Sequence, residues 1–406
     1  MNSKYDPKEP SIADYRSVDN LRVYCEDEHV GDLRRTPKGC VFQYTDAFLN
    51  SDQRPIALHL PKDPNGLIVE GIANLPTYFA GLLPEGVMLS AIRNLVGSAP
   101  DDLFAILAAT GSDAIGDIDV RIPGETAHSK PLDLEQAVHL IEALLHRRIN
   151  TLGDQITAIP GVQPKLSIGS IVRSGRKTTY IAKFESPDFP NLLRNEFECM
   201  RLAKRCRLNV ADVETRQRAL IIHRFDRKVI GPAKKIVKAH VEDLCQAMDL
   251  FPNAKYSMEY RDLMVAMQRL GTSKATLLDA LRLYVFSYII GNGDMHAKNI
   301  SMILDRETGQ WRLSPAYDLL STLPYCEVLP GADRMALALA GGSFGRFTVA
   351  EFVAFGAEFE LTEVAVVRML KAVSQAVLSH VQNVVCGVLT AKVVETMMLR
   401  AESLRP

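Results

Sequence analysis

Residues 291–299 read GNGDMHAKN and directly follow a long apolar run at residues 277–290. The run predicts a buried helix, and Gly-Asn-Gly should end it because glycine adopts backbone angles that other residues resist. Three polar side chains then follow at short spacing: Asp294, His296 and Asn299. A loop that leaves a buried helix has a rigid support, so the carboxylate, imidazole and amide are well positioned for chemistry.

The same interval between Asp and Asn occurs in the catalytic loop of protein kinases. There the Asp orients the acceptor hydroxyl and the Asn holds magnesium. The order Asp-x-His-x-x-Asn is similar to the variant in phosphoinositide-type kinases. A second magnesium ligand should follow a short hairpin, and Asp318 does follow two predicted strands, residues 299–305 and 310–316. Either Asp alone is explained by a cap or a strand end, but the ordered set favours a kinase site.

Longer motifs make the resemblance specific. GNGDMHAKNIS at residues 291–301, followed by LSPAYDLLST at 313–322, resembles the C-terminal half of the HipA family, the kinase toxins of bacterial toxin–antitoxin pairs. Other segments similar to this family occur upstream in the same order: LLPEG (82–86), GVQPK (161–165), NE (195–196), RFDR (224–227) and EDLCQ (242–246). The resemblance runs from about residue 20 to at least residue 340.

This resemblance implies an α+β, two-lobed kinase-like fold with a phosphoinositide-kinase-like catalytic loop. We expect an N-terminal α+β subdomain at residues 1–150, a nucleotide-binding small lobe at 151–232 and an all-helical catalytic C-terminal lobe at 233–406. In the first domain, alternation and turn residues predict strands at 21–25, 39–44 and 57–61. Helical patterns follow at 77–83, 85–96, 101–110 and 132–149.

Lys183 lies in the apolar strand pattern YIAKF. Burying a lysine there costs free energy unless an opposite charge pairs with its ammonium group. In kinases the nucleotide phosphates and a Glu on a helix pair with this ammonium group, and Glu196 is the candidate Glu here. The alternative is that the aliphatic part of the Lys183 side chain is buried while its ammonium group reaches solvent. Gly161 and Lys165 lie in a loop that can set backbone N–H groups and an ammonium against phosphates, although a simple loop entering a hairpin has the same pattern.

The resemblance implies further cofactor-binding positions for ATP: Gln163, His223, Phe225, Asp226 and Lys298. His223 occupies the hinge position, where the family usually has Glu. Asn299 and Asp318 are the implied Mg2+ ligands, and Asp294 is the implied catalytic residue. His296 either contacts phosphate or hydrogen-bonds to Asp294.

Two positions near these motifs need separate comment. Residues 240–248 predict the start of a helix with acidic residues in its first turn, where Asp243 and Gln246 either touch the nucleotide site or cap the helix. The family's autophosphorylated Ser corresponds to Ala158, which has no hydroxyl to accept phosphate. Self-inactivation by the family's route is therefore not expected.

The amino-acid composition limits which binding partners and which cellular compartment we expect. A hydrophobic share of 47%, a charged share of 23% and a net charge of -1 are those of a globular protein with no general attraction to nucleic acid or membrane. The seven cysteines include no C-x-x-C pair, which is typical of a reducing cytosol. The first residues contain no apolar signal sequence, and Arg368 and Lys371 interrupt the longest C-terminal apolar run. We expect a cytoplasmic protein without membrane association.

The resemblance implies a serine or threonine acceptor on a protein, possible examples being aminoacyl-tRNA synthetases. It also implies a small helix-turn-helix antitoxin, HipB-like, through which alone DNA would be contacted. The alternatives are a lipid or small-molecule kinase, a pseudokinase-like binding module or co-repressor, and a nucleotide-binding regulator. The lack of a basic amphipathic surface argues against a lipid. A scaffold would have no need of Lys183, Asp294, Asn299 and Asp318 together.

Overall fold

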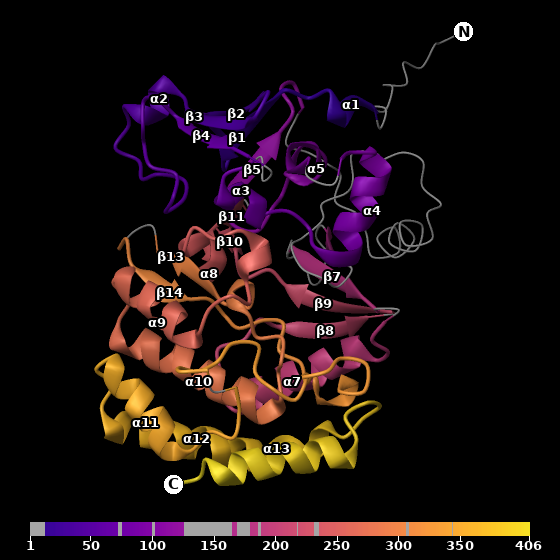
Figure 1. The fold of residues 1–406 in the computed structure, drawn as a ribbon, viewed down its shortest axis with the longest axis vertical. Coiled ribbons are helices and arrows are strands. Elements are labelled where there is room, and N and C mark those ends of the chain that lie inside the picture. The colour runs from indigo at the N-terminus through magenta and orange to yellow at the C-terminus, as the bar shows by residue number, and fades with distance from the viewer. Residues whose placement is uncertain are drawn as a thin grey trace. The chain divides into compact units, whose positions relative to one another are not determined.

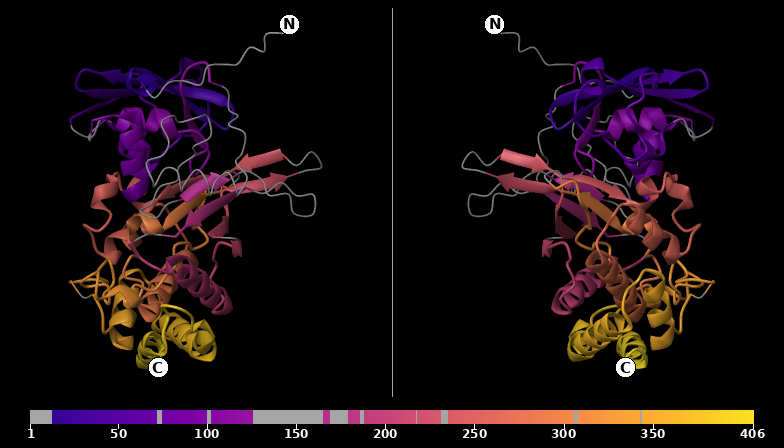
Figure 2. Two further views of the ribbon diagram at one scale, coloured as in Figure 1. Left: turned by 90° about the vertical axis from the view of Figure 1, so that its right-hand side faces the viewer. Right: turned by 90° about the vertical axis from the view of Figure 1, so that its left-hand side faces the viewer.

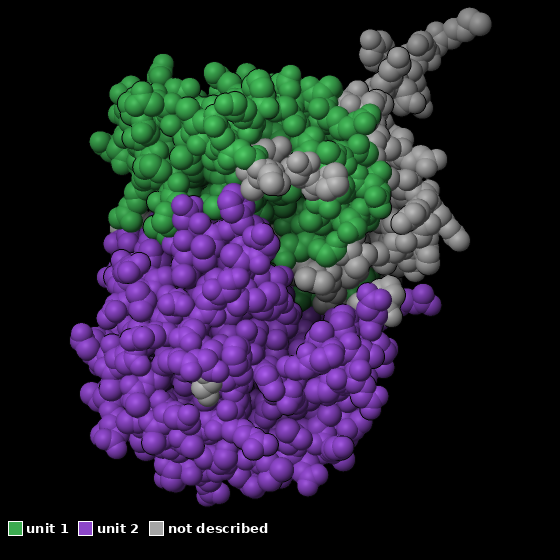
Figure 3. Space-filling model, viewed as in Figure 1, with its two compact units in different colours: residues 1–184, 227–238 green, residues 185–226, 239–406 purple. Residues whose placement is uncertain are grey.

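The structure is a computed structural model that describes residues 13–71, 75–99, 102–125, 165–168, 179–185, 188–216, 218–230, 235–305, 308–342 and 344–406. The chain divides into two compact units (Figure 3). The first comprises residues 1–184 and 227–238, and the second comprises residues 185–226 and 239–406. The expected three-domain division at residues 150 and 232 stays a prediction.

The first unit is built on a five-stranded antiparallel sheet in the order β4-β3-β2-β1-β5 (Figure 1). Its strands are β1 (Asn20–Cys25), β2 (Glu28–Thr36), β3 (Gly39–Tyr44), β4 (Leu67–Glu70) and β5 (Ile118–Arg121). The helices are α1 (Ala13–Arg16), α2 (Asp46–Leu49), α3 (Thr77–Gly81), α4 (Gly86–Val96) and α5 (Leu103–Thr110). Phe42 of β3 packs on Phe79 of α3, with ring centroids 5.3 Å apart, so helices cover one face of the sheet.

Most of the predicted elements in this unit are confirmed, but one strand is wrong. Residues 57–61 form turns, because the Leu60 carbonyl accepts a hydrogen bond from the Tyr44 hydroxyl at 2.6 Å instead of joining a ladder. The sheet contains β4 in its place, and it also contains β2, which was not predicted. The predicted helix at 132–149 lies outside the described residues.

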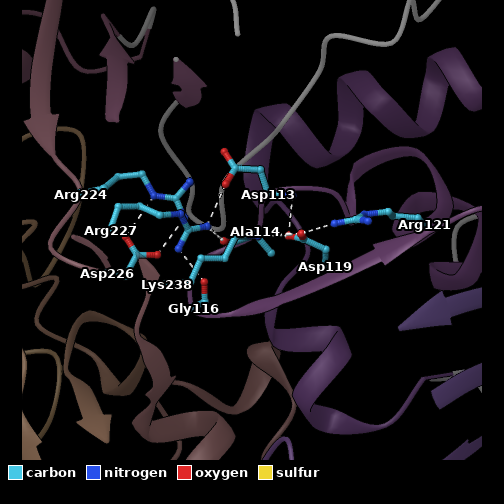
Figure 4. A network of polar contacts seen from close by, with 9 residues as sticks. All are labelled: Asp113, Ala114, Gly116, Asp119, Arg121, Arg224, Asp226, Arg227 and Lys238. Carbon is cyan, nitrogen blue, oxygen red and sulfur yellow. Dashed lines mark hydrogen bonds and ion pairs between the residues drawn. The ribbon is translucent and has the colours of Figure 1, made fainter. Parts of the chain in front are cut away.

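Two hairpins complete the first unit: β6 (Lys165–Ile168) with β7 (Tyr180–Phe184), and β10 (Arg227–Ile230) with β11 (Lys235–Lys238). The first and last residues of the second hairpin are paired with β5 and with the loop before it (Figure 4). Arg227 pairs with Asp113 at 2.8 Å and donates to two backbone carbonyls of the same loop. Lys238 pairs with Asp119 at 2.6 Å, and Arg121 pairs with the same carboxylate. These buried ion pairs explain why a distant hairpin belongs to this unit.

The second unit is organised around α10 (Lys274–Ile290), which begins at the N-cap Ser273. From Leu277 onward this helix is buried on nearly every side, as expected for a helix that is apolar all round. It contacts α9 (Tyr260–Arg269), α12 (Glu363–His380) and α13 (Ala391–Ser403). Figures 1 and 2 show α11 (Val349–Glu358), α12 and α13 together at the C-terminal end of the unit.

The other elements of this unit are short apart from one helix. They are α7 (Leu192–Arg205), α8 (Leu244–Ala247), the hairpin of β8 (Val213–Arg216) and β9 (Ala219–His223), and the 3-10 turns η1 (Pro252–Ala254), η2 (Ala297–Asn299), η3 (Leu323–Tyr325) and η4 (Val381–Val384). A three-stranded sheet contains β12 (His240–Asp243), β13 (Ser301–Leu304) and β14 (Trp311–Leu313).

This sheet corrects the expectation of an all-helical C-terminal lobe. The predicted hairpin β13–β14 is confirmed, but the prediction of a helix that begins at His240 is wrong. Its backbone instead pairs with β13, and the helix begins only at Leu244, with Asp243 as its N-cap. The acidic residues that were expected in the first turn of the helix therefore lie in β12.

One helical segment, Glu363–Val384, is long and apolar enough to cross a membrane by length and composition. Its buried residues include Val366, Leu370 and Val377, which lie on the side that packs within the unit. Arg368 and Lys371 are exposed. The segment therefore has the pattern of a core helix with one charged side.

Candidate active site

The loop that follows α10 is shaped by two glycines. Gly291 has a φ of 71°, and the Asn292 N–H donates to the Ser287 carbonyl at 2.8 Å, which closes the helix with a left-handed cap. Gly293 is needed for a different reason. A Cβ atom there would lie 2.7 Å from the Arg334 carbonyl oxygen and 2.6 Å from the Thr322 hydroxyl. The polar loop is thus held tightly between the helix end and a later segment.

Asp294 is the exposed acid of this loop, with 43% of its side chain accessible. The Tyr256 hydroxyl donates to its Oδ1 at 2.7 Å. Of the two alternatives for His296, the hydrogen bond to this carboxylate is not formed, because its Nε2 lies 3.9 Å from Oδ1. Tyr256, which the sequence did not single out, therefore fixes the Asp294 rotamer instead.

His296 is buried beside this pair. Its ring meets the Tyr256 ring edge to face, with centroids 5.0 Å apart. Burial, together with the ammonium groups of Lys255 and Lys298, lowers its pKa to about 3, and Asp318 opposes the shift. The imidazole is therefore neutral near pH 7, and within the described part of the chain its Nδ1 has no hydrogen-bond partner. A buried, unpaired ring nitrogen next to an exposed carboxylate is suited to a ligand oxygen.

Asn299 and Asp318 carry the amide and carboxylate oxygens that the sequence predicts as Mg2+ ligands. The Asn299 Nδ2 donates to the Asp294 carbonyl at 2.8 Å, which fixes the amide so that Oδ1 points elsewhere as an acceptor. Asp318 has a φ of 55°, an uncommon conformation for a non-glycine residue that is enriched at functional sites. Among the described residues no cluster of three or more His, Cys, Asp or Glu side chains could hold a metal. Mg2+ is commonly held by only one or two protein oxygens, since phosphates and water complete its shell.

The two candidate ligands are linked through Tyr317. Its hydroxyl donates to the Lys298 carbonyl at 2.9 Å and lies 2.6 Å from the Ser301 hydroxyl. Burial raises the Tyr317 pKa, so this hydroxyl stays protonated. Because Lys298 precedes Asn299 and Tyr317 precedes Asp318, the contact brings the neighbours of both candidate ligands together.

Lys298 has a partner that the sequence did not predict. Its ammonium lies 2.9 Å from Asp243 Oδ2, and both side chains are largely buried. Asp243 also forms a capping box with Gln246 at the start of α8, so the capping alternative is confirmed for that pair. The proposed role of Lys298 in nucleotide binding remains a prediction beside this ion pair.

The predicted hinge residues lie at the end of β9. Both carboxylate oxygens of the buried Asp226 accept from Arg224, at 3.0 and 2.7 Å. Phe225 stacks on Tyr317, with ring centroids 5.9 Å apart. The His223 N–H donates to the Asp212 carbonyl at 2.9 Å, so it extends the hairpin and is already engaged. Phe225 therefore offers its ring beside Tyr317, whereas Asp226 is engaged by Arg224.

The remaining predicted residues belong to different units. Lys183 on β7 is only 2% exposed, so the alternative of a lysine that reaches solvent is wrong. Lys165 lies opposite Lys183 in the β6–β7 ladder. Glu196 on α7 is fully buried in the second unit. Gly161, Gln163 and Ala158 lie outside the described residues.

Residues 21–121 match the HipA N-terminal domain family, and residues 157–381 match the HipA-like C-terminal domain family. A Sinorhizobium fredii protein, provisionally named kinase Y4dM, is 32% identical over 345 residues, 79% of this chain and 80% of that protein. The serine/threonine-protein kinase toxin HipA of Shewanella oneidensis is 28% identical over 300 residues, 67% of each chain.

The fold is also similar to a solved structure. Shewanella oneidensis HipA, in a complex with HipB and operator DNA, superposes with a TM-score of 0.69 at 22% identity. The alignment covers 95% of this chain and 96% of that one. At this identity the likeness shows the fold alone.

Proposed function

This chain belongs to the HipA family, and on that premise we propose that it is an ATP- and Mg2+-dependent serine/threonine protein kinase, the toxin of a bacterial toxin–antitoxin pair. The acceptor is a protein of the cytoplasm, with translation proteins such as aminoacyl-tRNA synthetases as the first candidates. The observation that carries the proposal is the loop after α10, where a fixed, exposed Asp294 lies beside an oriented Asn299.

Asp294 is the residue proposed to receive the acceptor hydroxyl. The Asp294 carboxylate is 43% exposed and can accept that O–H, while the Tyr256 hydroxyl holds its Oδ1. The bond from Tyr256 restricts the rotamer, so the carboxylate is oriented before the acceptor arrives. The hydroxyl oxygen would then bond to the γ-phosphorus of ATP as the bond from that phosphorus to the β–γ bridging oxygen breaks. ADP would leave with the bridging oxygen, and the hydroxyl proton would pass toward Asp294.

His296 is proposed to donate from Nδ1 to a phosphate oxygen. A neutral imidazole can carry one N–H, and its depressed pKa keeps it neutral across the physiological range. The lack of another partner for Nδ1 within the described residues supports this contact.

Asn299 and Asp318 are proposed to hold Mg2+ through one amide and one carboxylate oxygen. When bound, the ion would neutralise charge on the phosphates. Lys183, supported by Glu196, is proposed to pair with those phosphates, and residues Gly161, Gln163 and Lys165 to cover them. Phe225, with His223, Asp226 and Lys298, is proposed to line the nucleotide site.

The proposed partner is a small helix-turn-helix antitoxin similar to HipB. The solved relative is a HipA–HipB–operator DNA complex, which supports this proposal. A net charge of -1 supports DNA contact through the antitoxin and not through this chain.

The test is product analysis after incubation of the purified protein with γ-labelled ATP, Mg2+ and cell extract. Acid hydrolysis of the labelled protein band should release phosphoserine or phosphothreonine. Label in a small molecule or a lipid would show that the acceptor belongs to that class of compound and is not a protein. Nucleotide binding without any transfer would leave a pseudokinase-like binding module instead.

A further inference from the structure

A buried side chain of α7 holds the segment that follows Asp318. Asn195 Nδ2 donates to the Ser321 carbonyl at 2.7 Å, and its Oδ1 accepts from the Ser321 N–H at 2.9 Å. Asn195 and Ser321 are both completely buried. One amide therefore satisfies both backbone groups of a single residue, as a neighbouring β-strand would.

The same helix end packs against this segment in two further places. Leu320 forms a small apolar cluster with Leu192 of α7 and with Tyr325. The Tyr325 hydroxyl donates to the Pro190 carbonyl at 3.2 Å. The residues just after Asp318 are thus attached to the start of α7.

The other side of the segment is attached to the catalytic loop. The Thr322 N–H donates to the Gly291 carbonyl at 2.8 Å, and the Gly293 N–H donates to the Thr322 hydroxyl at 2.9 Å. Thr322 is itself buried. A continuous path of hydrogen bonds therefore runs from Asn195 through residues 321 and 322 to the backbone next to Asp294.

We propose that Asn195 is a positioning residue that fixes Asp318 relative to Asn299 and so sets the affinity for metal-bound nucleotide. This inference rests on the proposed function, because it assigns a role toward the metal site of that reaction. Asn195 precedes Glu196, and both are fully buried on α7. Through residues 321 and 322, α7 is thus attached both to the segment that follows Asp318 and to the loop that leads to Asn299.

The amide is required because it presents a donor and an acceptor at a fixed spacing. Alanine would leave the Ser321 N–H and carbonyl without this partner in a site that excludes water. Aspartate has nearly the same shape and still accepts from the N–H, but its ionised form opposes the Ser321 carbonyl with a second acceptor. Both changes should loosen the segment behind Asp318.

The experiment is calorimetric titration with a non-hydrolysable ATP analogue, in Mg2+ and in EDTA. We expect Mg2+ to tighten binding to the wild type. Asn195→Ala should reduce that Mg2+-dependent gain by about tenfold, whereas affinity in EDTA stays within about twofold. Circular dichroism checks folding, and Asn195→Asp, which retains the shape, decides the question if the alanine variant is unfolded.

Ser321→Ala is the matched control. Within the described residues the Ser321 hydroxyl has no hydrogen-bond partner, and the contacts to Asn195 use only its backbone. This variant should therefore keep the full Mg2+-dependent gain. The inference is overturned if the folded Asn195 variants keep it as well. If the wild type shows no gain with Mg2+, the proposed metal site itself fails, which is a different result.

Discussion

The hydroxyl of Tyr256 donates to Asp294 Oδ1 at 2.7 Å, and the ring of the same tyrosine meets His296 edge to face. One side chain from a separate loop thus contacts both polar groups expected to do the chemistry. Its hydroxyl restricts the carboxylate, and its ring covers the imidazole.

Tyr256→Phe removes the hydroxyl and keeps the ring against His296. Because a hydrogen bond to an ionised carboxylate is among the stronger ones, we expect phosphoryl transfer to fall by about tenfold. Affinity for ATP with Mg2+ should not change, since the hydrogen bond that is lost is to Asp294. An unaltered kcat for this variant in steady-state kinetics would show that Tyr256 does not orient Asp294 for transfer.

His296 should make the protein less stable in acid. Its pKa is about 3 in the folded protein, below the ordinary value of 6.5, so only the unfolded chain takes up its proton between these limits. The free energy of unfolding should therefore fall as pH drops through this window, by up to about 1.4 kcal/mol per pH unit from this residue. In urea denaturation at several pH values, the free energy of unfolding of His296→Asn should fall less steeply toward acid pH than that of the wild type. Equal slopes for the two proteins would mean that His296 becomes charged in the folded state.

Gly293→Ala tests the close packing of the catalytic loop. The new Cβ would lie 2.7 Å from the Arg334 carbonyl oxygen and 3.0 Å from that of Ala332, so the backbone must shift. We expect a loss of about 1–3 kcal/mol in the free energy of unfolding and a lower kcat. Gly345→Ala is the control, because its Cβ would meet no atom within 4 Å. Similar losses in the two variants would show that close approach is not the cause.

Local patterns predicted much of the fold and the loop. The apolar run of α10 and the glycine at its end could be predicted because helix burial and left-handed caps depend on neighbouring residues. The ordered set Asp294, Asn299 and Asp318 could be identified from its spacing, although its roles as metal and catalytic groups remain proposals. The strand β12 was missed because its ladder partner, β13, lies about 60 residues later in the chain.

The supporting contacts could not be predicted from local sequence. Tyr256 and Asp294 are 38 residues apart, and Asn195 and Ser321 are 126 apart. No periodicity or motif connects residues so far apart in the sequence, because tertiary packing brings them together. Lys298 likewise gave no local sign of its ion pair with Asp243.

The most direct test of the central claim compares the wild type with Asp294→Asn in transfer of labelled γ-phosphate from ATP to protein. Asparagine has nearly the same shape but is neutral and a poor base, so we expect transfer to fall by about 100-fold or more while ATP still binds with Mg2+. Asp279→Asn, at an exposed position near the start of α10, should transfer at the wild-type rate. Equal transfer by wild type and Asp294→Asn, or equal silence while both bind ATP, would contradict the assignment of Asp294 as the catalytic residue of a kinase.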